Sequence, residues 1–184
     1  MLDDLQGIQE RARCLYNEAE VEAALDRIAT EIGRDFSSSN PVVLCVMNGG
    51  LIMTGKLATR MNFPLQMDYL HATRYRDRTR GSDLEWKRHP ELVLTGRAVV
   101  ILDDILDEGA TLAAIIKHVK ALHPSRLAVA VLVNKLHDRK TQGVTADYVG
   151  LEVEDHYVYG YGMDFKGYLR NAPGIYAADP QDCD

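Results

Sequence analysis

The sequence has few cysteines and no long apolar run. Its three cysteines, Cys14, Cys45 and Cys183, lack the close spacing of a metal site or a disulfide framework. We interpret them as reduced thiols, which predicts a cytoplasmic protein. No apolar run approaches the roughly 20 residues of a membrane span, and the acidic start MLDDLQ is unlike a signal peptide. We therefore expect no membrane partner.

An excess of basic charge is also missing. The chain has 21 Lys and Arg against 27 Asp and Glu, a formal net charge of −6. Nucleic-acid binding requires a basic face, so we expect no nucleic-acid partner. The 46% hydrophobic and 26% charged residues are typical of a globular protein, and 184 residues suit a single domain spanning 1–184.

Apolar segments alternate between strand-like and helix-like patterns. Asn17 followed by Glu20 predicts the start of a helix. Strands are predicted over 42–47, 64–75, 99–102 and 126–133, and helices over 51–61 and 111–122. This alternation predicts an α/β fold whose central, mostly parallel sheet is flanked by helices, with a core at about 18–150. The N-terminal segment and about 151–184 are predicted to form a small hood, and 73–91 a long mobile loop.

Four carboxylates gather where one predicted strand ends, in the run VVILDDILDEGATL. Ligands of open α/β sheets bind beyond the carboxyl ends of the strands, which is where Asp103 and Asp104 are predicted to lie. The loop from Asp107 to Thr111, which leads into a helix, offers backbone N–H groups suited to a phosphate. The acids can then accept hydrogen bonds from ribose hydroxyls or bind magnesium. Together these features predict a site for a phosphorylated sugar.

This run resembles the phosphoribosyl-pyrophosphate signature of the type I phosphoribosyltransferases. From about Val42 to Arg170 the chain is similar to the 6-oxopurine branch of that family, the hypoxanthine–guanine phosphoribosyltransferases. The resemblance rests also on three ordered segments, MNGG, VLVNK and DHYVYGYGMDF. It implies the type I phosphoribosyltransferase fold and magnesium-dependent purine salvage. In that reaction the 5-phosphoribosyl group passes from 5-phosphoribosyl-1-pyrophosphate to hypoxanthine or guanine. A homodimer or homotetramer is also implied.

The resemblance further implies a role for individual residues. Asp107 matches the general base or hydrogen-bond partner near purine nitrogen seven, and its acidic neighbours predict a raised proton affinity. The residues implied for phosphoribosyl pyrophosphate are Asn48, Gly49, Asp103, Asp104, Asp107, Glu108, Gly109, Ala110, Thr111 and Arg170. Those implied for the purine are Lys135, Tyr157, Val158 and Asp164, and those for magnesium are Asp103, Asp104 and Asp164. A cis peptide bond between Met47 and Asn48 is implied as well.

Other interpretations remain open at the level of sequence. A xanthine-preferring phosphoribosyltransferase, or a regulatory protein that keeps the fold without catalysis, would carry the same signature. A receiver-type signalling domain fits poorly, because its acids are spread along the chain. The histidines show no metal-ligand spacing and are interpreted as surface or loop residues; they are His71, His89, His118, His123, His137 and His156.

Overall fold

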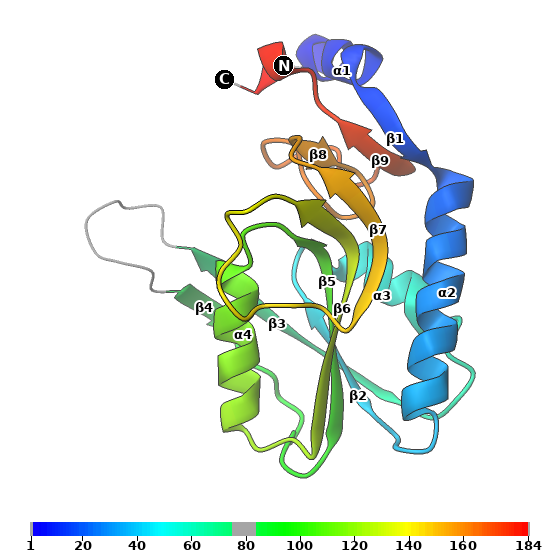
Figure 1. The fold of residues 1–184 in the computed structure, drawn as a ribbon, viewed down its shortest axis with the longest axis vertical. Coiled ribbons are helices and arrows are strands. Elements are labelled where there is room, and N and C mark those ends of the chain that lie inside the picture. Colours follow the sequence, from blue (N-terminus) through cyan, green and yellow to red (C-terminus); the bar gives the residue numbers. More distant parts are fainter. Residues whose placement is uncertain (1, 75–83, 184) are drawn as a thin grey trace.

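A six-stranded sheet forms the centre of the protein (Figure 1). The computed structural model describes residues 2–74 and 84–183. The strand order is β4-β3-β2-β5-β6-β7, and every neighbouring pair is parallel except β3 with β4. The strands are β2 (Val42–Val46), β3 (Gln66–Arg74), β4 (Leu84–Arg88), β5 (Ala98–Leu106), β6 (Arg126–Leu136) and β7 (Tyr148–Glu154).

Helices cover both faces of this sheet, as the alternating pattern predicts. The helices α2 (Glu18–Phe36) and α3 (Leu51–Ala58) lie on one face and α4 (Ala110–Ala121) on the other (Figure 1). The predicted start of α2 is confirmed, because the Asn17 side chain accepts the Glu20 N–H and the Glu20 side chain accepts the Asn17 N–H. None of the helices in the described parts of the chain is long and apolar enough to cross a membrane.

A second, three-stranded sheet joins the two ends of the chain. Its order is β1-β9-β8, with antiparallel pairing throughout. The helix α1 and the short 3-10 helix η1 lie beside it (Figure 1). The predicted hood begins too early, since residues 151–154 belong to β7 and pair with β6 in the central sheet. The elements are α1 (Leu2–Arg11), β1 (Arg13–Asn17), β8 (Val158–Tyr159), β9 (Gly174–Ala177) and η1 (Pro180–Asp182).

The strand β5 is longer than the sequence predicts. Its pairing with β2 ends at Leu102, where the predicted strand also ends, but its pairing with β6 continues to Leu106. Asp103 and Asp104 therefore lie within β5, at an edge that β2 no longer covers. From β2 the chain proceeds to β3 on one side, and from β5 to β6 on the other. A crevice for ligands forms at such a reversal of strand order.

The loop predicted at 73–91 is partly a β-ladder. The strand β3 continues to Arg74, and β4 pairs with it, with Thr73 opposite Glu85. The tip of the predicted loop, residues 75–83, lies outside the described residues.

One ionic cluster connects the β8–β9 connection to the helices. Glu22 of α2 accepts hydrogen bonds from Lys56, from Arg60 and from the Tyr161 hydroxyl. Burial alone would raise the pKa of Glu22, but the hydrogen bonds from Lys56, Tyr161 and Arg60 outweigh it and lower the pKa to about 2. Tyr161 is itself buried. The cluster thus fastens the segment after β8 to the face covered by α2 and α3.

Replacing Glu22 with Gln is expected to cost roughly 1–2 kcal/mol of unfolding free energy at neutral pH, because three donors lose a charged acceptor that is partly exposed. The folded-state pKa lies below the ordinary value of 4.5, so this contribution is present above pH 4.5 and is lost as the pH falls toward 2. The difference between wild type and Glu22→Gln should therefore shrink on acidification, as measured by urea unfolding at several pH values. Glu31→Gln, which removes a 3.9 Å pair with Arg27 on the same helix, serves as the control. A difference that is independent of pH would contradict the role of the Glu22 charge.

Candidate active site

The crevice between β2 and β5 opens into a cavity of about 690 Å³. The turn after β2 forms one wall, and the end of β5 with the start of α4 forms the other. Most residues that the sequence implies for the sugar phosphate line it, namely Asn48, Gly49, Asp103, Asp104, Asp107, Glu108, Gly109, Thr111 and Arg170. The fold therefore brings together these residues from three separate segments of the chain, at 48–49, 103–111 and 170.

Asp103 and Asp104 form a buried acidic pair at this cavity. They are 8% and 9% exposed. The pKa of Asp103 is raised well above its ordinary value, mainly by burial and secondly by the charge of Asp104. Burial also raises the pKa of Asp104, against the opposing effects of its hydrogen bond with Asp103 and the charge of Arg170. Two buried carboxylates of this kind are stabilised by a nearby cation or by hydroxyl groups that donate hydrogen bonds, so the pair is suited to binding either.

The backbone is packed unusually closely at two glycines, at Gly49 against Asp104 and at Gly162 against Gly49. A Cβ at Gly49 would lie 2.0 Å from Oδ2 of Asp104, and a Cβ at Gly162 would lie 2.0 Å from the Gly49 carbonyl oxygen. Gly162 also has a φ of 111°, which side chains rarely adopt. The Met47–Asn48 peptide bond that begins this turn is cis, as the resemblance implies. The turn after β2, the acidic pair and the β8–β9 connection are thus packed as three layers.

The loop from Asp107 to Thr111 ends at the N-terminus of α4. Gly109 precedes the helix with a φ of 79°, and α4 begins at Ala110. The Thr141 N–H donates to the Glu108 carbonyl over 2.7 Å, which ties this loop to the segment after β6. The first N–H groups of a helix have no partner within it, and with the Thr111 side chain they suit a phosphate group.

A second cavity, of about 300 Å³, adjoins the first. It shares Asp104, Ile105 and Asp107 with the larger cavity. All the side chains that the sequence implies for the purine line it, namely Lys135, Tyr157, Val158 and Asp164. Tyr157 is 40% exposed and meets the edge of Phe165, with ring centroids 5.2 Å apart. An exposed ring beside a cavity offers a surface on which a flat ligand can stack.

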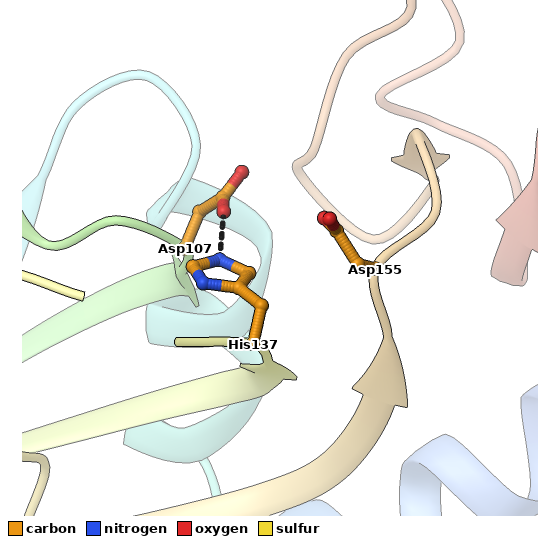
Figure 2. A group of neighbouring side chains, drawn as sticks. All are labelled: Asp107, His137 and Asp155. Carbon is orange, nitrogen blue, oxygen red and sulfur yellow. Dashed lines mark hydrogen bonds and ion pairs between the residues drawn. The ribbon is translucent and has the colours of Figure 1, made fainter. Parts of the chain in front are cut away.

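Asp107 lies where the two cavities meet and has a partner on each oxygen. Lys135 Nζ donates to Oδ2 over 2.9 Å, and His137 Nε2 lies 2.6 Å from Oδ1 (Figure 2). Burial alone would raise the pKa of Asp107, but the hydrogen bonds from Lys135 and then His137 outweigh it and lower the pKa. The raised proton affinity predicted from the acidic neighbours is therefore wrong for this state, because two donors face the carboxylate more closely.

His137 is the functional candidate that the sequence interpretation missed. It lies in the loop after β6, as one of the two predicted alternatives has it, but its side chain is only 4% exposed. The signal that finds it is its spacing, because residues two apart on an extended chain point to the same side and His137 follows Lys135 by two. The alternation continues past the end of β6, so both side chains reach Asp107.

Asp107, His137 and Asp155 each offer one possible metal-ligand atom, and these atoms lie within 4.8 Å of one another (Figure 2). Such spacing is that of a possible metal site. Lys135 Nζ lies 2.9 Å from Asp107 and 3.6 Å from Asp155, and Arg139 pairs with Asp155 over 2.7 Å. These cations already offset both carboxylates, so the group is better described as an ion-pair network than as a metal centre.

Asp164 and Arg170 face each other at the junction of the cavities. Their ion pair spans 2.7 Å, and Asp164 also accepts the Gly167 N–H over 2.7 Å. Arg170 donates in addition to the Gly162 carbonyl over 2.5 Å. The arginine predicted for pyrophosphate and the carboxylate predicted for magnesium are therefore each other's partner here.

Comparison with known proteins places this chain in a family. The model of the phosphoribosyl transferase domain matches residues 13–166, and the chain belongs to this family. It is 30% identical over 175 residues to the hypoxanthine-guanine-xanthine phosphoribosyltransferase of Tritrichomonas foetus, covering 95% of this chain and 92% of the relative. It is 27% identical over 169 residues to the hypoxanthine-guanine phosphoribosyltransferase of Bacillus subtilis (strain 168), covering 91% and 93%.

Solved structures agree with these relatives. A hypoxanthine-guanine-xanthine phosphoribosyltransferase superimposes with a TM-score of 0.83 at 29% identity, covering 91% of this chain and 96% of the other. A hypoxanthine-guanine phosphoribosyltransferase from Bacillus anthracis gives 0.85 at 27% identity, covering 91% and 98%. The resemblance stated from the sequence and the fold class it implies are confirmed.

The close packing at Gly49 predicts a sharp effect of one methyl group. Gly49→Ala places Cβ against Asp104 and should destabilise the protein by about 1–3 kcal/mol, as overpacking does. Gly55→Ala is the matched control, because nothing lies within 4 Å of its added Cβ and Ala favours the α3 helix by roughly 0.5–1 kcal/mol. Urea unfolding of both variants should move the midpoint in opposite directions. Equal shifts would show that the turn after β2 is not packed on Asp104.

Proposed function

We propose that this protein is a magnesium-dependent enzyme of purine salvage. It transfers the 5-phosphoribosyl group from 5-phosphoribosyl-1-pyrophosphate to hypoxanthine or guanine, giving IMP or GMP and pyrophosphate. The observation that carries the proposal is the position of Asp107, between a polar cavity that ends at a helix N-terminus and a cavity lined by Lys135 and Tyr157. The names of the relatives support it.

The larger cavity would hold phosphoribosyl pyrophosphate. Its 5-phosphate would lie on the backbone N–H groups at the start of α4 and on Thr111, since this end of a helix favours anions. The ribose hydroxyls would donate to Asp103 and Asp104. The pyrophosphate would meet the backbone at Asn48 and Gly49, with Arg170 supplying positive charge.

The smaller cavity would hold the purine. Tyr157 would stack on the ring, and the Val158 backbone would meet its edge. Lys135 would donate to the exocyclic oxygen of a 6-oxopurine. Adenine presents an amino group at that position, so two donors would face each other and adenine would be rejected.

Asp107 would accept the proton that the purine releases. The bond from the anomeric carbon to the pyrophosphate oxygen breaks, a bond from that carbon to purine nitrogen nine forms, and the proton on nitrogen seven passes to Asp107. The transition state resembles an oxocarbenium ion, so the protein needs no nucleophile. When Lys135 turns to the purine oxygen, Asp107 loses the donor that lowers its pKa most, and its proton affinity rises.

Magnesium fits the acidic pair of this site. Asp103 and Asp104 offer the oxygen ligands that magnesium prefers, and a cation would offset the repulsion between the buried carboxylates. Asp164 would join them once Arg170 turns to the pyrophosphate. Bound magnesium would neutralise the charge that develops on the leaving pyrophosphate. We further propose a cytoplasmic homodimer or homotetramer, as the family resemblance implies.

The direct test is turnover of 5-phosphoribosyl-1-pyrophosphate and magnesium with hypoxanthine, guanine, xanthine and adenine, each offered separately. Nucleotide should form from hypoxanthine or guanine and not from adenine. Asp107→Asn should lower kcat by about 100-fold or more, in the range of general acid–base catalysis, whereas Asp138→Asn at an exposed position should not. Preferred turnover of xanthine would change the substrate assignment. Sugar-phosphate binding without turnover of any base would indicate a regulatory protein.

Lys135→Gln tests how the 6-oxo group is recognised. The amide can donate to the purine oxygen but carries no charge, so KM for hypoxanthine should rise about 10- to 100-fold. The amide can also accept a hydrogen bond from the amino group of adenine. The preference for hypoxanthine over adenine should therefore become smaller. The ratio of kcat/KM for the two bases measures this, with KM for phosphoribosyl pyrophosphate as the internal control. An unchanged ratio would place recognition of the oxygen elsewhere.

A further inference from the structure

His137 contacts Asp107 on the oxygen that Lys135 does not use. Its Nε2 lies 2.6 Å from Oδ1 (Figure 2). Lys135 Nζ lies 2.9 Å from Oδ2. We propose that His137 is a positioning residue for the reaction, which holds Oδ1 of Asp107 so that Oδ2 faces the purine when Lys135 leaves it. The inference rests on the proposed function, because that function requires Lys135 to turn to the base.

The orientation of the His137 ring is set by its other nitrogen. Nδ1 accepts the backbone N–H of Arg139 over 3.1 Å. A neutral imidazole has one donor and one acceptor nitrogen, so its proton then lies on Nε2 and points at Asp107. The side chain of Arg139 pairs with Asp155 through two hydrogen bonds of 2.7 and 3.0 Å, which holds this turn in place.

His137 acts through Asp107 and not on the substrate. Among the described residues, Asp107 and Lys135 line the smaller cavity, whereas His137 lines neither of the two cavities. Its side chain is 4% exposed against 42% for Asp107. A half-exposed carboxylate at the start of a loop can rotate once a partner departs, and the buried imidazole behind it keeps one oxygen fixed. The hydrogen bond is therefore placed to preserve geometry during the step in which Lys135 moves.

The charges around Asp107 determine how removal of His137 changes the pH dependence of the reaction. Lys135 and His137 face the carboxylate from β6 and its extension, and Arg139 adds positive charge from the following turn. The acids nearby are Asp104 and Glu108 on the same segment and Asp155 after β7. Without the His137 donor, the pKa of Asp107 rises, since one of its stabilising hydrogen bonds is lost.

The test compares His137→Leu and His137→Gln with wild type, using hypoxanthine, phosphoribosyl pyrophosphate and magnesium. His137→Leu should lower kcat about 10- to 100-fold, the loss of one hydrogen bond to a charged group, with KM for phosphoribosyl pyrophosphate little changed. The acidic limb of kcat/KM for the base should move to higher pH. Gln carries an N–H near the position of Nε2, so His137→Gln should recover most of the loss. Asp138→Asn, the exposed next residue, is the control and should move neither quantity.

Two results would overturn the role of His137 alone: unchanged kinetics in His137→Leu, or equal losses in the Leu and Gln variants. Wild-type turnover distinguishes failure of this role from failure of the proposed function. If the wild-type protein turns over no base, the proposed function and the role of His137 are both overturned. If His137→Leu does not fold, His137→Asn replaces it, since the shorter amide does not reach Asp107. Nitrogen-15 NMR of the wild-type imidazole adds a readout independent of activity, and a proton on Nδ1 at neutral pH would contradict the proposal.

Discussion

The site depends on the unequal lengths of two paired strands. β5 continues beyond the end of β2 while β6 still pairs with it, so Asp103 lies opposite Val131 on one side and the acidic pair faces an open crevice on the other. A carboxylate in the middle of a fully paired sheet would have no solvent and no ligand to face. One at the free side of the strand can be buried and still reach a substrate. The turn after β2 and the loop before α4 are then brought to opposite walls of one cavity.

The site also depends on the way in which Asp107 shares its hydrogen-bond partners. Lys135 holds Asp107 in this state and would hold the base during the reaction, so recognition of the 6-oxo group and release of the carboxylate become the same movement. Such an exchange would make the reaction selective for the base, because a base without a hydrogen-bond acceptor at this position would leave the Lys135–Asp107 ion pair intact. In the role proposed above, His137 would take no part in the exchange and would keep its contact with Oδ1 of Asp107 throughout. The acids of the pair and the acid of the loop thus have different electrostatic surroundings although they are close in sequence.

Features that depend on neighbours in sequence were predictable, and features that depend on register were not. The Asn17–Glu20 capping box spans four residues, and the acidic run with its glycine and threonine is continuous, so both are visible in the chain. The true end of β5 is not, because Ile105 and Leu106 remain in the strand through pairing with Val133 and Asn134, far along the chain. The same register carries Lys135 and His137 to Asp107. The early boundary of the predicted hood has this cause as well, since pairing with β6 keeps residues 151–154 in the central sheet.

The pairing of β1 with β9 has a consequence for the order in which the molecule is completed during synthesis. Arg13 and Asn17 pair with Ala177 and Gly174, and β8, which carries Val158 beside the smaller cavity, is held by β9. A chain still on the ribosome can form the central sheet and, apart from Arg170, the lining of the larger cavity before residues 174–177 emerge. The wall that would receive the base is fixed only when those residues are released. A nascent chain is therefore expected to gain its sugar-phosphate cavity first and its base cavity last.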